Sequence, residues 1–152
     1  MNSADVNDAI IKEITIRAPA ERIFEALVDP RQRLQWWGAE GQFQTTHMES
    51  DLRLGGAWLM RGIGTGGKRF TVRGEYRAIE RPRLLEFTWL PDWQENAPLT
   101  IVRFDLNEED GFTTVRLTHS RLATERPRES PRNWQQILAR LQVYVEDNEA
   151  SN

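Results

Sequence analysis

The sequence of 152 residues contains no cysteine, which excludes disulfide bonds, thiolate nucleophiles and cysteine-ligated metals. It contains only two histidines, His47 and His119, and their spacing forms no metal-binding cluster with carboxylates. The Gly-x-Ser-x-Gly pattern of a serine nucleophile at a sharp turn does not occur either. We therefore expect no metal and no other cofactor.

An excess of one charge and a long apolar run are also missing. The 20 basic and 23 acidic residues are interspersed and leave a net charge of −3, without the basic patch expected of a nucleic-acid-binding protein. No apolar run approaches the roughly 20 residues of a membrane-spanning helix. The N-terminal MNSADVNDAI is polar and acidic, unlike a secretory signal, so we expect a cytoplasmic protein.

Aromatic residues are abundant by contrast, with six tryptophans and six phenylalanines, and the first elements of the chain have clear local signals. Residues 10–18 alternate between apolar and polar, as a strand does. Pro19 then stands at the first position of a helix over AERIFEALV. Asp29 and Pro30 are suited to the N-cap and first position of a second, short helix, which Gly38 ends.

From about residue 42 to 120 the apolar positions repeat every two residues, which indicates consecutive antiparallel strands. Residues 43–47 and 49–54 are expected as separate short strands. Ser130 and Pro131 then begin a helix of about 16 residues, long enough to lie across a sheet. Its apolar face carries Trp134, Leu138, Leu141 and Val145.

This order of elements is typical of an α+β fold in which a curved antiparallel sheet of about six to seven strands grips the final helix. The length of the chain suits one domain that buries roughly 68–70% of its extended-chain surface. We expect that domain to cover residues 10–148, after a flexible tail over residues 1–9.

The segment GIGTGGKR, residues 62–69, resembles a phosphate-binding loop but is interpreted as a turn. It fits Gly-x-Gly-x-x-Gly, and Gly62 to Lys68 fit the first seven positions of a Walker A loop. Such loops run into a helix N-terminus, whose free N–H groups bind the phosphate. Here a strand pattern begins at Phe70, and Arg69 stands where serine or threonine would hold magnesium. A hairpin turn explains the glycines.

Several blocks of the sequence resemble one protein family: IRAPAERIFEALVDPRQRLQWWG, DLRLGGAW, GEYRAIERPRLLEFTW, and VRFDL followed by GFTTVRLTHS and the helix of Trp134. Over residues 10–147 the chain resembles the C-terminal-like family of activators of the 90-kDa heat-shock-protein ATPase, within the START/SRPBCC superfamily. The resemblance implies a helix-grip fold with a cavity between the bent sheet and the C-terminal helix. Superfamily members bind lipids, hormones or polyketides, and some catalyse cyclisation or hydrolysis. Chaperone activation belongs to longer eukaryotic relatives that have an additional N-terminal domain.

The inward faces of the strands and the last helix would line such a cavity. Tyr76 and His119 are the polar side chains expected to orient a ligand there. Adjacent residues on a helix point about 100° apart, so one of Trp36 and Trp37 is expected in the core and the other near the surface, at the cavity mouth or a partner interface. Packing against one another is the alternative role of these aromatics. The other expected lining residues are Trp58, Met60, Phe70, Val72, Phe87, Trp89, Phe104, Leu117, Leu138, Leu141 and Val145.

Three functions remain open at this point. The leading hypothesis is binding of a hydrophobic small molecule that is lipid-like, aromatic or polyketide-like. The rival is a protein-interaction module, related to the chaperone ATPase activators, that binds a chaperone or another protein through exposed aromatics and the Arg-rich segment 121–132; a homodimer is also left open. The third is a small cyclase- or hydrolase-type enzyme using His119 or Tyr76 as an acid or base, without an inward carboxylate pair to assist. The carboxylates expected on the solvent face are Glu75, Glu86 and Asp105.

Overall fold

The computed structural model describes residues 10–39, 41–92, 99–121 and 131–150, so the expected tail over 1–9 and most of the Arg-rich segment lie outside the described residues. Strand β1 (Ile10–Ile16) is followed by helices α2 (Ala20–Val28) and α3 (Pro30–Trp36). The next strands are β2 (Gly38–Ala39), β3 (Phe43–Ser50), β4 (Ala57–Gly64) and β5 (Arg69–Glu80). The last elements are β6 (Leu84–Pro91), β7 (Thr100–Glu109), β8 (Phe112–Arg121) and α4 (Pro131–Ala150).

Helix α3 begins where the sequence predicts, whereas α2 begins one residue later than predicted. Asp29 is the N-cap of α3, and its Oδ1 accepts a hydrogen bond of 3.0 Å from the backbone N–H of Arg31. Pro30 occupies the first helical position. Pro19 is not the first residue of α2, as predicted, but its extended N-cap, and the helix begins at Ala20.

The eight described strands form one antiparallel sheet in the order β1-β8-β7-β6-β5-β4-β3-β2. The sequence predicts fewer strands because β2 has only two residues, too short for a visible period. The prediction of separate strands over 43–47 and 49–54 is wrong. Strand β3 is continuous, with a register shift between Thr45 and His47 that interrupts the alternation.

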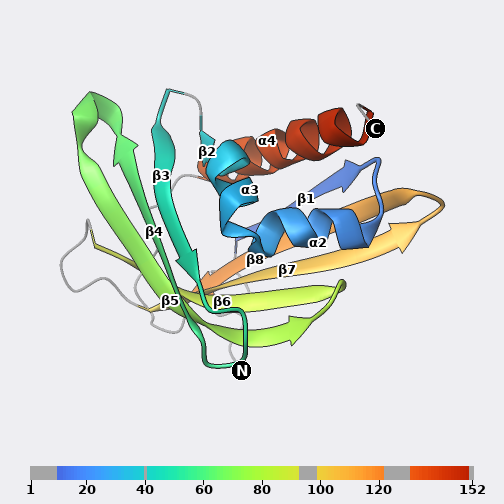
Figure 1. Ribbon diagram of the computed structural model, residues 1–152, viewed down its shortest axis with the longest axis horizontal. Coiled ribbons are helices and arrows are strands. Elements are labelled where there is room, and N and C mark those ends of the chain that lie inside the picture. Colours follow the sequence, from blue (N-terminus) through green and yellow to red (C-terminus); the bar gives the residue numbers. More distant parts are fainter. Residues whose placement is uncertain (1–9, 40, 93–98, 122–130, 151–152) are drawn as a thin grey trace.

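The sheet curves around the helices, and α4 lies across its open side (Figure 1). Register shifts in β3 and in β5, between Tyr76 and Ala78, are bulges that bend these strands. Helix α4 contacts β1 at one edge and β2 at the other. Gln142 Nε2 donates to the carbonyl of Thr15 in β1 at 3.1 Å, and Arg140 Nε donates to the carbonyl of Trp36 at 2.9 Å. The predicted α+β helix-grip fold is thereby confirmed.

The glycine-rich segment is a hairpin connection, as predicted. A short 3₁₀ turn (Thr65–Gly67) joins β4 to β5. Gly66 and Gly67 have φ of +74° and +79°, a conformation that side chains other than glycine rarely adopt. A strand follows at Arg69, so the phosphate cradle lacks the helix N-terminus that it requires.

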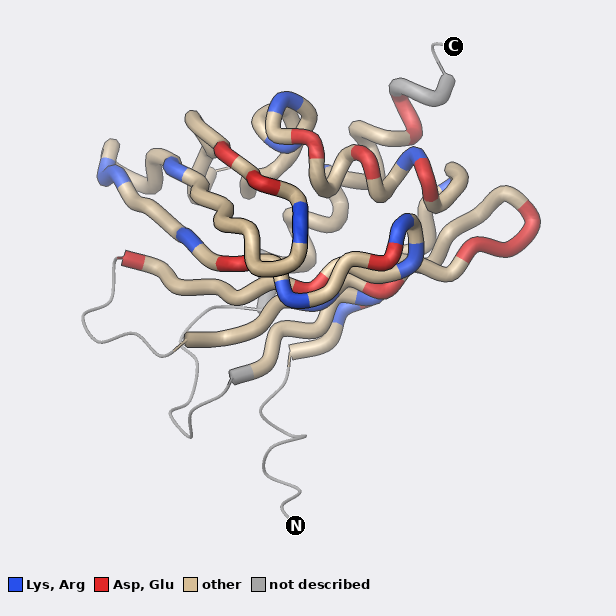
Figure 2. The backbone as a smooth tube through the Cα atoms, turned by 60° about the horizontal axis from the view of Figure 1, so that its bottom comes forward, with Lys and Arg blue, Asp and Glu red and all other residues tan. Residues whose placement is uncertain are grey.

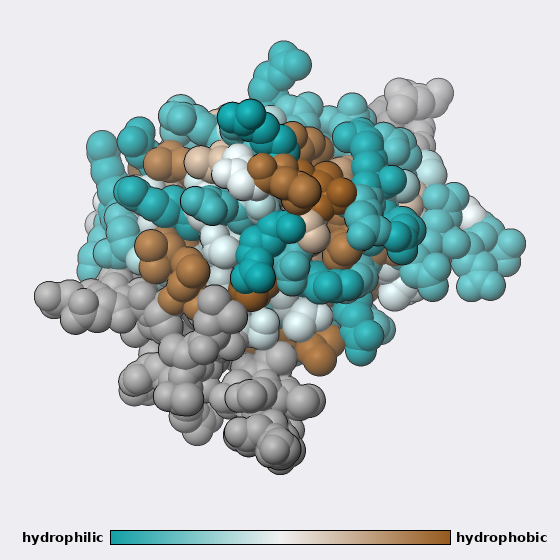
Figure 3. Space-filling model, turned by 90° about the horizontal axis from the view of Figure 1, so that it is seen from below, coloured by the Kyte–Doolittle hydropathy of each residue, from teal (hydrophilic) through white to brown (hydrophobic). Residues whose placement is uncertain are grey.

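Charges of both signs alternate over the surface, apart from an acidic tip at the β7–β8 turn (Figure 2). That tip contains Glu108, Glu109 and Asp110. Seen from below, apolar side chains lie in separate patches among hydrophilic ones (Figure 3). Among the described residues, no helix has the length and apolar character needed to cross a membrane.

Candidate functional site

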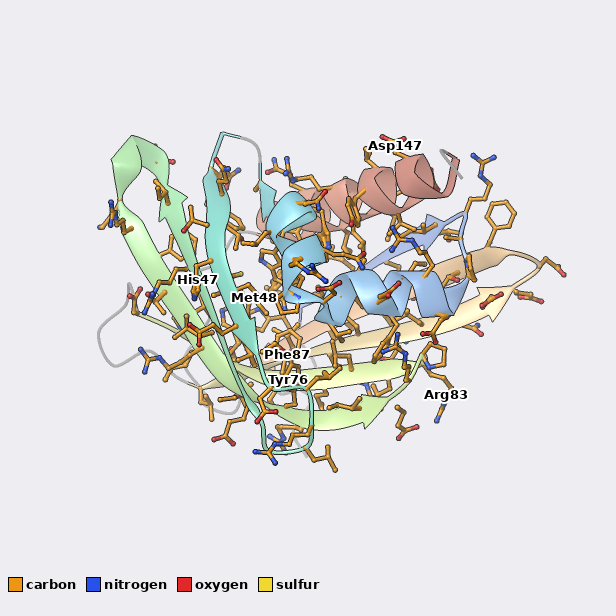
Figure 4. All side chains as sticks on the ribbon, in the orientation of Figure 1. His47, Met48, Tyr76, Arg83, Phe87 and Asp147 are labelled. Atoms are coloured by element: carbon orange, nitrogen blue, oxygen red, sulfur yellow. The ribbon has the colours of Figure 1, made fainter. Side chains whose placement is uncertain are left out.

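The interior between the sheet and α4 is filled mainly by aromatic side chains. Seven buried residues form what we call the aromatic cluster: Trp37, Trp58, Tyr76, Phe87, Trp89, Phe104 and Trp134. Neighbouring ring centroids within it lie 5.1 to 6.4 Å apart, in tilted, stacked and edge-to-face arrangements. Figure 4 labels Tyr76 and Phe87 of this cluster, together with Met48 of β3, near the middle of the bent sheet.

The structure buries every predicted lining residue except Phe70. Phe70 is half-buried at the β4–β5 hairpin, with its ring 5.6 Å from that of Phe43 in edge contact. Met60 is buried beside Thr45, whose Oγ1 lies 3.6 Å from its sulfur and donates to the carbonyl of Trp37 at 2.7 Å. The prediction that these residues contact a ligand remains a prediction. The predicted residues that pack into the same core as the aromatic cluster include Val72, Leu117, Leu138, Leu141 and Val145.

The expectation that one of Trp36 and Trp37 lies near the surface is wrong, because their exposed fractions are 1% and 2%. Trp36 is the last residue of α3, and its indole N–H donates to the carbonyl of Ala26 at 3.0 Å. Trp37 is already extended, with φ −74° and ψ 102°. The spacing of 100° per residue therefore ends at Trp36, and the two indoles find separate buried positions.

Each of the two tryptophans nevertheless lines a hollow at the surface. A cleft of about 480 Å³ between the end of α3, the start of β3 and the end of β4 reaches Trp37; Leu34, Phe43 and Ile63 are among its other lining residues. A smaller hollow of about 300 Å³ between α3 and α4 reaches Trp36. Sites for small ligands have volumes of roughly 300–1,000 Å³, so the cleft at Trp37 is large enough for one.

Arg33 of α3 is the most unusual side chain of the interior, since it is charged and only 1% exposed. Its guanidinium carbon lies 4.1 Å from the centroid of Trp37, 5.7 Å from that of Trp58 and 5.9 Å from that of Phe87. These contacts are cation–π interactions, which recover part of the cost of burying the charge. Arg33 is thus held against the aromatic cluster by ring faces.

The guanidinium of Arg33 has no anionic partner among the described residues. Its Nε and Nη2 are buried without a hydrogen bond, and no described carboxylate forms a salt bridge with it. Burial lowers the pKa of Arg33 to about 10, an effect that Tyr76 partly opposes, so the group stays cationic at neutral pH. A buried charge without a partner costs several kcal/mol.

Sequence reasoning missed Arg33, although one signal was present. It precedes Trp36 by three positions and Trp37 by four, the spacing that places side chains on the same face of a helix. An arginine on the same helix face as the buried aromatics is therefore expected to be buried, whereas the arginines of the solvent face are not. That signal identifies the position of Arg33 but gives no information about its partners.

Three indole N–H groups of the aromatic cluster also lack a hydrogen-bond acceptor among the described residues, those of Trp37, Trp58 and Trp89. Trp58 Nε1 lies against the sheet, 2.6 Å from the position that a Cβ of Gly74 would occupy. The Thr88 carbonyl oxygen lies 1.9 Å from the same position, so we assign Trp58 to packing against the backbone. Trp37, Trp89 and Arg33 are left as donors without acceptors.

His119 has the opposite character, because both of its ring nitrogens are satisfied. Trp134 Nε1 donates to Nδ1 at 3.0 Å, which places the proton of the neutral ring on Nε2. That nitrogen lies 2.9 Å from Thr100 Oγ1, which donates in turn to the carbonyl of Trp89 at 3.2 Å. Burial lowers the pKa of His119 to about 4. The ring is therefore neutral at pH 7 and acts as a fixed link between β7, β8 and α4.

The arrangement offers little for acid–base catalysis. The buried polar residues among those described include Arg33 and His119 but no carboxylate. Glu75 is exposed, while Glu86 and Asp105 are partly buried. In the described part of the chain, no three histidine or carboxylate side chains gather as a metal site would require. What the interior provides is an apolar wall with a few hydrogen-bond donors.

Comparison with known proteins agrees with this fold. The sequence matches, over residues 17–146, the family described as Activator of Hsp90 ATPase homolog 1-like protein. The chain belongs to this family. The resemblance found in the sequence is thereby confirmed. A comparison with curated proteins finds no match.

Solved structures with the same fold include a protein that is described as AHSA1-like. An AHSA1-like protein from Aeromonas hydrophila is 25% identical, with a TM-score of 0.73 over 91% of this chain and 94% of that chain. A protein from Chromobacterium violaceum is 22% identical, with a TM-score of 0.79 over 92% and 98% of the two chains. DynU16, from the dynemicin biosynthetic locus, is 22% identical, with a TM-score of 0.72 over 93% of this chain and 48% of that chain.

Proposed function

We propose that this AHSA1-like protein binds an apolar small molecule between the sheet and α4, against the aromatic cluster. The observation that carries the proposal is a set of buried donors that find no acceptor in the described part of the chain: Arg33, Trp37 and Trp89. In native cores nearly all buried polar groups are hydrogen-bonded, so each unpaired group needs an explanation, and a bound ligand would supply the missing partner. An apolar wall with a few unpaired polar groups is what a small-molecule site requires.

The cleft beside Trp37 supports the same function because it lies next to a residue of the aromatic cluster. It has the volume of a small-molecule site, and Trp37 belongs both to its wall and to the aromatic cluster. Movement of this one indole would connect the cleft with the interior. In this proposal Trp37 guards the mouth of the site, the role that the sequence suggests for one of the paired tryptophans.

The two other functions have less support from the described residues. A protein-interaction module was expected to expose a tryptophan, and Trp36 and Trp37 are both buried. Its second expected surface, the Arg-rich segment 121–132, falls mainly outside the described residues. An enzyme with His119 as acid or base would need a free ring nitrogen, and both are occupied.

Mass spectrometry on protein purified gently from its own cells tests the proposal. The intact protein is weighed under native conditions, and its solvent extract is then analysed for small molecules. We expect one apolar molecule per chain, released on denaturation. A chain that leaves the cell empty and then takes up no hydrophobic probe, such as N-phenyl-1-naphthylamine, would instead have a filled core, and the proposal would be wrong.

A further inference from the structure

We propose that the ligand is an acid, an apolar molecule whose carboxylate or similar oxyanion pairs with the Nε–Nη2 edge of Arg33. The inference rests on the proposed function and specifies the chemical class of the molecule that the same site binds. It identifies Arg33, a residue of the short helix α3, as the group that selects the ligand.

The two unpartnered atoms of Arg33 are the pair that a carboxylate needs. Nε and Nη2 lie on the same edge of the planar guanidinium, and their N–H groups point in nearly parallel directions. A carboxylate binds such an edge with both oxygens at once, through two charge-assisted hydrogen bonds. One free nitrogen would be consistent with a water molecule, but a complete free edge has the geometry of an oxyanion site.

Among the described residues, no group around Arg33 could replace an external anion. Trp37, Trp58 and Phe87 present ring faces to the guanidinium. The Tyr76 hydroxyl is already engaged with Ser50 Oγ at 2.6 Å. The remaining unpaired polar groups of the cluster, which include the indole of Trp37, are donors like Arg33 itself. A site composed of donors selects for an acceptor, and a cationic one selects for an anion.

The surrounding aromatic cluster restricts which anions fit. Three aromatic rings lie with their centroids 4.1 to 5.9 Å from the guanidinium carbon and favour a ligand with an apolar body. Trp37 contacts Arg33 with its ring and also forms part of the cleft wall, so it links the surface cleft to the charge. We therefore infer an aryl or aliphatic acid with its oxyanion inward at Arg33 and its apolar body among the rings.

Two fluorescent probes with the same body test this inference. 8-Anilinonaphthalene-1-sulfonate carries an oxyanion, and N-phenyl-1-naphthylamine is its neutral counterpart. The dissociation constant of each is measured by titration for the wild type, for Arg33→Met and for Arg73→Met. Methionine keeps the length and apolar stem of arginine without the charge. Arg73 is an exposed arginine of β5, so its variant controls for the loss of a surface charge.

We expect the wild type to bind both probes and to prefer the sulfonate. Arg33→Met should weaken sulfonate binding by about 10- to 100-fold, the effect of a charged hydrogen-bonding group, and leave the neutral probe nearly unchanged. Arg73→Met should keep the preference of the wild type. The ratio of the two dissociation constants within each protein removes differences in general hydrophobic affinity.

The other outcomes are distinguishable. Binding of the neutral probe with no preference for the sulfonate, in the wild type and in Arg33→Met alike, would overturn the acid inference and leave the proposed function standing. If both arginine variants lose the preference for the sulfonate probe equally, the sulfonate binds at the surface, and the acid inference is also overturned. If the wild type binds neither probe, the proposed function itself fails. The comparison within the wild type remains valid even if Arg33→Met does not fold.

Discussion

Two buried polar side chains illustrate how differently the same apolar interior can treat a titratable group. His119 is satisfied on both ring nitrogens by Trp134 and Thr100, and burial keeps it neutral. Arg33 stays charged and has an unpaired edge. Because an unpaired buried charge is costly, we assign a structural role to His119 and propose a ligand-binding role for Arg33.

The neutral state of His119 makes stability depend on pH. Its pKa is about 4 when folded and 6.5 as the reference value, so between these pH values the unfolded chain binds more protons. The free energy of unfolding should therefore fall as the pH falls from 6.5 to 4, by about 3 kcal/mol from this residue alone. Urea unfolding of the wild type and of His119→Gln at pH 7 and pH 4 measures this contribution as the difference in pH dependence.

His47→Gln is the matched control, because His47 is partly exposed and its Nε2 contacts the exposed carboxylate of Glu49. It should lose stability on acidification as the wild type does, whereas His119→Gln should lose less. Equal pH dependence in all three proteins would show that His119 does not titrate out of a buried, neutral state.

For single residues, the sequence predicts which side chains are buried better than it predicts which groups they contact. The alternating pattern correctly places Tyr76, Phe87 and Phe104 inside. The pattern did not reveal that Trp37 turns inward, since that depends on where α3 ends. It also did not identify Arg33, because hydrophobic periodicity assigns charged residues to the solvent face.

Among the elements, β5 requires a glycine at one position, Gly74. Gly74 lies where β5 meets β6, and a Cβ there would be 1.9 Å from the Thr88 carbonyl oxygen and 2.6 Å from Trp58 Nε1. Both distances are shorter than any real contact. The glycine thus lets the strands and the Trp58 indole approach closely just before the bulge at Tyr76–Ala78.

Gly74→Ala should consequently destabilise the protein by about 1–3 kcal/mol or more through overpacking. Gly64→Ala is the matched control, since its Cβ would lie 3.5 Å from the nearest atom, the Gln42 carbonyl oxygen, an ordinary contact. That variant should change stability by no more than about 0.5 kcal/mol. Urea unfolding measures both, and equal stability of the two variants would contradict the close approach at Gly74.

The elements that the sequence predicts well are those with local signals. The cap at Asp29 and the strand pattern on both sides of the glycine turn are read from neighbouring residues. The elements it misses depend on distant ones: β2 forms only because β3 pairs with it, and the bulge in β3 joins two segments that alternate in different phases.

The whole molecule is a bent sheet whose two edges are bridged by one helix. Helix α4 contacts β1 and β2, which are farthest apart in the sheet order, and its residue Trp134 reaches the aromatic cluster. We propose that a ligand enters this interior by displacing a side chain. In our proposal that side chain is Trp37, between the cleft and Arg33.

The most direct test of binding in this interior is a ¹H–¹⁵N spectrum of the indole N–H groups during titration with whichever of the two anilinonaphthalene probes binds more tightly. The indole N–H groups of Trp37 and Trp89 have no acceptor among the described residues, whereas that of Trp36 donates to the carbonyl of Ala26. We expect the signals of Trp37 and Trp89 to shift most and to saturate at one probe per chain, with a smaller change at Trp36. If the indole signals stay fixed while only surface amides shift, the probe binds outside and the interior is a filled core.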